Sequence, residues 1–214
     1  GILNTLVGGL AGDALNIGNS NVAIGHQALT TEVAGDRNVA IGLNALRLQT
    51  NASSTDVYNV AVGYEAGAAI TTAVRNTLIG GLSGDAITTG SDNVSLGYNS
   101  FGSNTIGNSN VSIGKDAMMT NVASDRNVAI GHSALKLSTA ASTADHYNVA
   151  VGFEAGVAIS SGVQNTLLGG KAGDVITSGN NNIIIGYNAG AAAEDSANSV
   201  TFGDANISAI RCQV

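Results

Sequence analysis

The sequence predicts an all-β protein, a parallel β-solenoid of about twelve coils that are each 17 or 21 residues long. Three observations predict this fold: a recurring asparagine, a glycine four residues after it, and a short β-branched segment between the two. A fixed period of this kind is typical of solenoids, in which each repeat packs only on its neighbours. The copies start at Asn4, Asn21, Asn38, Asn59, Asn76, Asn93, Asn110, Asn127, Asn148, Asn165, Asn182 and Ser199.

The segment after each of these anchor residues predicts a β-strand that ends in a glycine turn. Segments 39–41 and 149–151 are short, apolar and rich in β-branched residues, as strands are. We expect the glycines to provide turns with positive φ or close backbone contacts, and the asparagines to form a hydrogen-bonded ladder or turn at one corner of each coil. The glycines are Gly8, Gly25, Gly42, Gly63, Gly80, Gly97, Gly114, Gly131, Gly152, Gly169, Gly186 and Gly203.

Both faces of the expected strands are apolar, which predicts that another chain covers one of them. The first and third residues after an anchor share one face and are almost all Val, Thr or Ile. The second residue points the other way and is mostly Ala or Ser. A coil of 17 residues, even with two strands as we expect, is too thin to cover both faces. One face should therefore fill the roll and the other should meet sister chains, in a rod of about 55–60 Å.

The two 21-residue coils are the candidates for binding. Each carries four extra residues in a matching place, over 48–58 and 137–147, because five coils are duplicated as a block of 89 residues. Insertions in solenoids form loops that often mark a binding face. The alternative interpretation, a spacer that relieves twist, stays open. The candidate receptor contacts are Tyr58, Tyr147, His146, Asp56 and Asp145, of which the tyrosines could stack on a sugar.

Composition excludes several classes of function. Only eight Lys and Arg residues are present, they are dispersed, and the net charge is −7, so we expect no nucleic-acid partner. No apolar run approaches the roughly 20 residues of a membrane helix, so we expect no membrane insertion.

Asp36-Arg37 and Asp125-Arg126 precede anchors and are expected to form exposed or interchain ion pairs.

Catalytic chemistry finds little support in the residues. The chain has neither a Gly-x-Ser-x-Gly elbow nor a phosphate-binding Gly-Lys-Ser/Thr loop. Glu65 and Glu154 are equivalent but lie five coils apart, or about 24 Å, whereas glycosidase carboxylates need roughly 5–10 Å. His26 and His132 are also equivalent, and we expect them to face solvent. We therefore expect no enzyme activity, no metal and no other cofactor.

The repeat Asn-Val-Ala-Ile-Gly-x-x-Ala, as in 21–28, 38–45 and 127–134, resembles the head repeats of YadA-like trimeric autotransporter adhesins. That resemblance implies a left-handed parallel β-roll assembled as a homotrimer, either intertwined or side by side. The longer form, Asn-x-Ala-Ile-Gly-x-x-Ala-Leu, resembles repeats of bacteriophage tail-fibre proteins. This chain departs from the adhesin repeats in length, because those are typically shorter than 17 residues.

The C-terminal segment 200–214 resembles the junction that precedes the self-cleaving intramolecular chaperone of tail fibres and endosialidase-like proteins. We therefore divide the chain into a β-roll domain, 1–198, and a last partial coil with the junction to an absent chaperone domain, 199–214. The catalytic residues of that chaperone are not in this sequence.

These features together predict a homotrimeric fibre shaft or tip that mediates adsorption of a phage to a glycan or protein receptor on the host cell, and hence a location in the virion. The first alternative is the head of a bacterial trimeric adhesin at the cell surface. A polysaccharide depolymerase is a weaker alternative, because it would need carboxylates or histidines gathered at one level of the rod.

Overall fold

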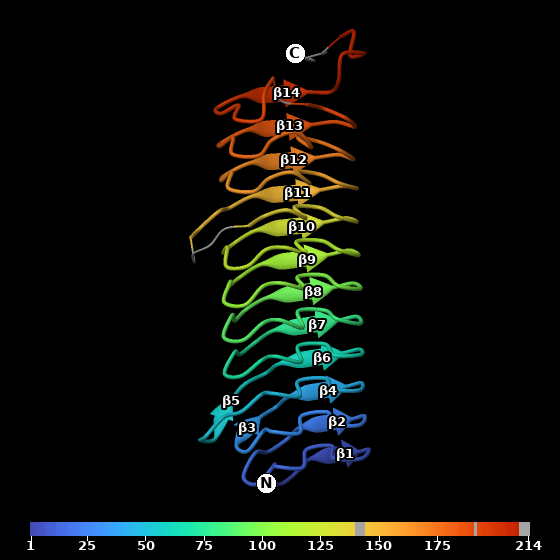
Figure 1. Ribbon diagram of the computed structural model, residues 1–214, viewed down its shortest axis with the longest axis vertical. Coiled ribbons are helices and arrows are strands. Elements are labelled where there is room, and N and C mark those ends of the chain that lie inside the picture. The colour runs from blue at the N-terminus through green and yellow to red at the C-terminus, as the bar shows by residue number, and fades with distance from the viewer. Residues whose placement is uncertain (140–143, 191, 210–214) are drawn as a thin grey trace, which may run out of the picture.

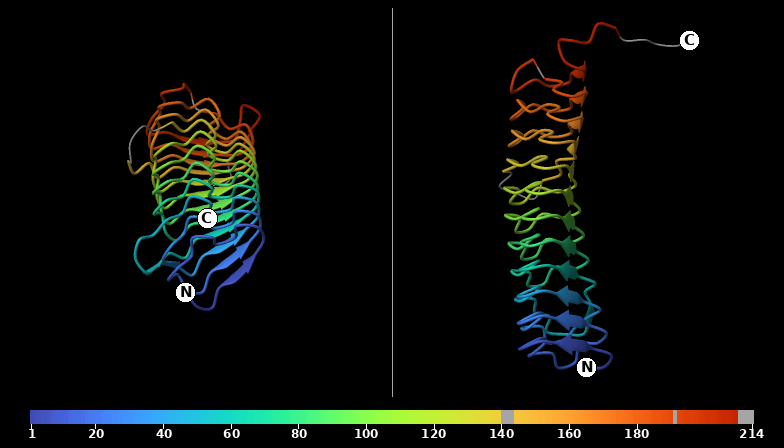
Figure 2. Two further views of the ribbon diagram at one scale, coloured as in Figure 1. Left: turned by 60° about the horizontal axis from the view of Figure 1, so that its bottom comes forward. Right: turned by 90° about the vertical axis from the view of Figure 1, so that its right-hand side faces the viewer.

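A computed structural model describes residues 1–139, 144–190 and 192–209 and confirms the parallel β-solenoid. Its coils stack into a straight rod with a 12-stranded parallel sheet along one side (Figures 1 and 2). The strands of this sheet are β1 Thr5–Val7, β2 Val22–Ile24, β4 Val39–Ile41, β6 Val60–Val62, β7 Thr77–Ile79, β8 Val94–Leu96, β9 Val111–Ile113, β10 Val128–Ile130, β11 Val149–Val151, β12 Thr166–Leu168, β13 Ile183–Ile185 and β14 Val200–Phe202. A separate two-stranded sheet pairs β3 Gly35–Asp36 with β5 Thr55–Asp56.

The expectation of two strands in each coil is wrong, because each coil supplies one three-residue strand to the main sheet. The opposite wall consists of turns, since the sixth and eighth residues after most anchors have left-handed φ angles. In the coil of Asn93 these are Asn99 (φ 53°) and Phe101 (φ 58°), which an extended strand cannot contain. Hydrogen bonds still join successive coils there, as from Phe101 N–H to the Ala117 carbonyl (2.9 Å).

The strands are in register throughout, and this register decides which of their faces lies inside. Val94 pairs with Val111, and Leu96 with Ile113, so equivalent residues stack directly. The middle residue of each inner strand is fully buried, as at Ser95. The first and third residues point away from the core and are partly or well exposed.

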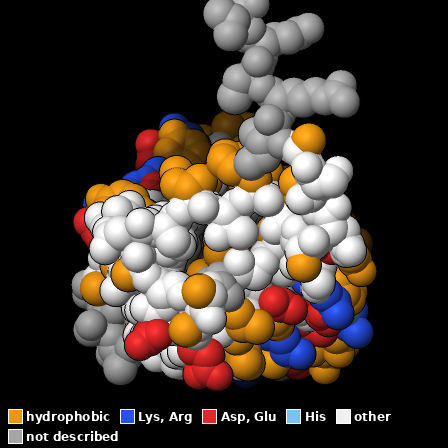
Figure 3. All heavy atoms as spheres, turned by 90° about the horizontal axis from the view of Figure 1, so that it is seen from above, with side chains coloured by type: hydrophobic (Ala, Val, Ile, Leu, Met, Phe, Trp, Pro, Cys, Tyr) orange, Lys and Arg blue, Asp and Glu red, His pale blue; other side chains and the backbone are white. Residues whose placement is uncertain are grey.

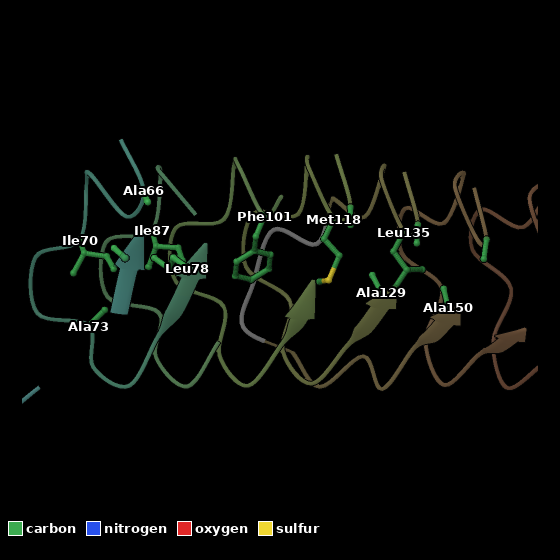
Figure 4. Packing of buried hydrophobic residues seen from close by; sticks show 14 of the residues in the cluster. Ala66, Ile70, Ala73, Leu78, Ile87, Phe101, Met118, Ala129, Leu135 and Ala150 are labelled. Carbon is green, nitrogen blue, oxygen red and sulfur yellow. The ribbon is translucent and has the colours of Figure 1, made fainter. Parts of the chain in front are cut away.

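Large core side chains come from the middle of the strand at Leu78, Leu167 and Ile184, and otherwise from two alternative positions in the turn wall (Figure 4). In five coils the eighth residue after the anchor is large and the eleventh is polar. In four others the eleventh is isoleucine and the eighth is glycine. The buried large residues at the eighth position are Leu29, Leu46, Phe101, Met118 and Leu135, and those at the eleventh are Ile70, Ile87, Ile159 and Ile176.

The alternation has a steric cause. A Cβ atom added to Gly84 would lie 2.8 Å from Cδ1 of Ile87 and 2.9 Å from Cδ2 of Leu78. Real Cβ atoms do not approach other atoms this closely, so the isoleucine and a large residue at the glycine cannot share one coil. Each layer of this thin core therefore has room for one of the two.

The predicted asparagine ladder is confirmed and runs through the interior. In each step the backbone N–H of one anchor donates to Oδ1 of the preceding anchor, as from Asn110 to Asn93 (3.0 Å). The side-chain Nδ2 of Asn110 also donates to the carbonyl of Ser124 in its own coil (2.9 Å). Both ends of a fully buried amide are thus satisfied, which burial of such a group requires.

The turn glycines confirm the predicted positive φ. At Gly97 φ is +140°, and an added Cβ would lie 2.7 Å from the backbone carbon and oxygen of Gly114 in the next coil. The glycines therefore stack directly on one another, and both backbone angle and space exclude a side chain.

We predict that Gly97→Ala lowers the free energy of unfolding by about 2–4 kcal/mol. The new Cβ would strain the backbone at this positive φ and would also overlap the backbone of Gly114 in the next coil. Gly81→Ala is the matched control, since its nearest atom would be 3.7 Å away and its φ is not positive. Chemical unfolding followed by circular dichroism measures both. Equal stability of the two variants would contradict the proposed stacking.

Candidate functional site

The first insertion leaves the rod between β4 and β6 without interrupting the stack. Its chain forms β5, which pairs with β3 and stands out from one corner of the rod (Figure 1). The ladder continues beneath it, because Asn59 N–H still donates to Oδ1 of Asn38 (3.3 Å) across 21 residues. The extra residues are therefore placed on the surface.

A buried carboxylate holds this insertion in place. Glu32 Oε1 accepts hydrogen bonds from the backbone N–H groups of residues 33–35 (2.7–3.0 Å) and of Asn51 (3.0 Å). Its Oε2 accepts from Gln49 Nε2 and Asn51 Nδ2, both at 2.8 Å. Gln49 in turn accepts a hydrogen bond from Asn59 Nδ2 (2.9 Å), which joins the insertion to the ladder.

Burial alone would raise the pKa of Glu32, but these hydrogen bonds outweigh it and hold the pKa below the usual value of a glutamate. The carboxylate is therefore charged at neutral pH although its side chain is fully buried. The insertion is thus held by a charge-assisted network, which is stronger than neutral hydrogen bonds of the same number.

Two of the predicted contact residues meet on the surface of the first insertion, and an arginine joins them. Asp56 forms an ion pair with Arg37, and the Arg37 guanidinium lies 5.6 Å from the centroid of the Tyr58 ring. The Tyr58 hydroxyl donates to Asp56 (3.3 Å). All three side chains are about half exposed.

The second insertion repeats this cluster. Asp145 forms an ion pair with Arg126, whose guanidinium lies 5.8 Å from the Tyr147 ring. The Tyr147 hydroxyl donates to Asp145 (3.0 Å). Residues 140–143 of this insertion lie outside the described part of the chain, whereas Asp125 and Asp145 form an isolated bridge that corresponds to the pair of β3 and β5.

His146 differs from the other predicted contacts, because its side chain is only 5% exposed. Its ring Nδ1 lies 2.6 Å from the Ala144 carbonyl oxygen, and its counterpart in the first insertion is the fully buried Val57. His146 therefore supports the insertion from beneath and does not belong to the exposed cluster.

Sequence reasoning missed the part that Arg37 and Arg126 play in these clusters. The exposed ion pairs expected there exist, but the partners are Asp56 and Asp145, about 19 residues further along. The neighbouring Asp36 is buried and accepts from Asn19 N–H (2.6 Å). One signal in the sequence could have revealed these clusters. Arginine, aspartate and tyrosine occupy the same positions in both copies of the 89-residue block.

The outward side of the main sheet is the second candidate. Its first and third strand positions form two columns of apolar side chains along the rod, with Leu96 still 45% exposed. Seen from the C-terminal end, charged side chains lie in a few groups near the rim, between larger hydrophobic and uncharged areas (Figure 3). The outward face of the main sheet, with its two apolar columns, therefore has the chemistry of an interface.

Among the described residues, no three His, Cys, Asp or Glu side chains come close enough to hold a metal ion, and no helix could cross a membrane. His26 and His132 are exposed as expected, and the His132 ring stacks on Phe153 at 5.4 Å. No protein-family model, curated protein or solved structure matches the chain. Its resemblance to fibre repeats therefore depends on its own residues alone.

We predict that Glu32→Gln destabilises the protein at pH 7 by about 1–3 kcal/mol, because an amide cannot accept all of these hydrogen bonds. The folded pKa is lowered, so this contribution is present at neutral pH and is lost as pH falls below the usual glutamate value of about 4.3. Urea unfolding at pH 7 and at acid pH should show the difference from wild type shrinking. The exposed Glu194→Gln serves as control, and a difference independent of pH would contradict the charged state of Glu32.

Proposed function

We propose that this chain forms the shaft of a homotrimeric fibre that attaches a bacteriophage to the surface of its host cell. The observation that carries the proposal is the apolar outer face of the main sheet, which continues from β1 to β14. Its repeats and its C-terminal segment, which resemble those of tail fibres, support the phage in preference to a bacterial adhesin.

The outer face is uniform along the whole rod. Twelve strands with two outward positions each give 24 side chains, of which three are threonine (Thr5, Thr77 and Thr166) and the other 21 are Val, Ile, Leu or Phe. The strip measures roughly 10 Å by 55 Å, or about 550 Å². That is near the upper limit of the largest apolar patch on a typical monomer.

A second copy of the chain is the partner that fits this face best. The side chains repeat at about 4.8 Å along the rod, and a partner must present the same repeat for every coil to find an equivalent contact. Another copy does so without further requirement. Cyclic symmetry then gives a closed assembly, and the resemblance to trimeric fibres and adhesins supports three copies.

The two insertion clusters are the proposed receptor contacts of this fibre. Asp56 and Tyr58, like Asp145 and Tyr147, combine a carboxylate with an aromatic ring at an exposed corner. Such pairs suit a sugar, which offers hydroxyl groups and an apolar ring face. Three copies of each cluster would act together, so that weak single sites give firm attachment.

We predict a solution mass near three times 21.1 kDa by light scattering. Ile113→Asp with Ile130→Asp should convert the protein into a folded monomer, because burying these charges between copies is costly. The matched control is Val122→Asp with Val175→Asp, which places the same charges on exposed apolar residues outside the sheet. A monomeric wild type would refute the fibre proposal.

We further predict that Asp56→Ala with Asp145→Ala weakens binding of the labelled trimer to host cells by at least ten-fold, at unchanged mass. Avidity multiplies the loss at each site. Asp13→Ala is the control, because Asp13 is an exposed carboxylate in the turn wall, outside the insertions. Equal binding by both variants would exclude the insertions as the contact sites.

A further inference from the structure

Two corners of the rod border the outer face of the sheet, and they differ in chemistry. We call the residues directly before each anchor the entry column and those directly after each turn glycine the exit column. The entry column is Leu3, Ser20, Arg37, Tyr58, Arg75, Asp92, Ser109, Arg126, Tyr147, Gln164, Asn181 and Asn198. The exit column is Gly9, His26, Leu43, Tyr64, Gly81, Tyr98, Lys115, His132, Phe153, Gly170, Tyr187 and Asp204.

Both columns hold exposed side chains on a regular backbone. All twelve residues of the entry column have φ between 51° and 63°, so their side chains leave the corner in a uniform way. In the exit column, Tyr64, Tyr98, Phe153 and Tyr187 are 50–74% exposed. Aromatic side chains so exposed, in one line beside an apolar face, extend that face beyond the sheet.

Symmetry decides which columns meet. If parallel copies place their sheets toward a common axis, rotation brings the exit corner of one copy to the entry corner of the next, as in any heterologous cyclic interface. An antiparallel pair would instead bring like corners together. The difference in chemistry between the corners is therefore what a parallel cyclic assembly requires.

The two columns also match in size at most levels outside the insertion coils. Rotation without translation brings together residues of the same coil, which are six residues apart and differ in height by about 1.7 Å. The three glycines of the exit column then face the long side chains of Leu3, Arg75 and Gln164. Four bulky exit residues face small or short polar entry residues, as Lys115 faces Ser109, whereas Leu43 and His132 face the longer Arg37 and Arg126.

The two insertion coils show the same match with aromatic rings. At these levels Tyr64 faces Tyr58, and Phe153 faces Tyr147. Paired aromatic rings stabilise an interface by more than the burial of their apolar area alone would. A shift by one coil would place Tyr64 against Arg37 or Arg75 and lose both pairs.

We propose that the exit column of one copy docks in register on the entry column of the next, and that this contact sets the alignment of the fibre. The proposal rests on the parallel homotrimer proposed above. It places Tyr58 and Tyr147 at the seam between two copies, with Asp56 and Asp145 beside it. The receptor contacts would then be completed by the exit column of the neighbouring copy.

Cysteine cross-linking in the 214-residue chain with Cys212→Ser tests this contact. The variant Ser109→Cys with Lys115→Cys carries one thiol in each column at the same level, on two exposed side chains. A short bis-maleimide should convert it to covalent dimers and closed trimers. Either single variant should stay monomeric on a denaturing gel, because neither column meets itself.

A register control carries Lys115→Cys with Gln164→Cys, three coils apart, or about 14 Å. It should react at least ten-fold more slowly than the matched pair. Three outcomes would each overturn the proposed contact without contradicting the trimer. These are equal rates for the two pairs, cross-linking of a single variant, or a protein of trimer mass that forms no cross-links. A monomer mass for the Cys212→Ser protein would instead remove the trimer itself.

Discussion

The buried asparagine ladder is the interaction on which the other features of this rod depend. A primary amide in the middle of a thin coil has no access to water, and leaving it without partners would cost about 1–3 kcal/mol at each level. The next coil supplies the partner at one point only, as between Asn93 and Asn110. Register between coils is therefore fixed, and stacked glycines, aligned strands and a continuous outer face follow from it.

The same constraint explains where the chain can vary. Four extra residues cannot enter the stack without breaking the step from Asn38 to Asn59, so they form a surface loop. At the first insertion Glu32 supplies the buried acceptor for the backbone N–H groups of the adjoining turn, whereas Asn121 occupies the equivalent position beside the second insertion. Inside the stack, variation is confined to exchanges that conserve volume, such as that between Phe101 with a polar eleventh residue and Gly84 with Ile87.

Function on such a rod must therefore reside on its surface. The interior is identical in kind from coil to coil, whereas the corners carry the residues that differ, including the clusters at Arg37 and Arg126. A periodic face favours a partner with the same period, and a local insertion favours a partner of limited size. The fibre proposal assigns the first to sister chains and the second to a receptor.

Much of this architecture is determined by sequence alone, because period, anchors and turn glycines each follow from local steric and hydrogen-bonding needs. Tertiary structure decided what depends on contacts between coils. A turn wall stands where a second strand was expected, because residues such as Gln27 and Leu29 have left-handed φ angles that their side-chain types do not favour. The ion pair of Arg37 with Asp56 and the burial of His146 both depend on how neighbouring coils pack at the insertions. The periodicity specifies which residues stack, but only the folded coil specifies which side chains face water.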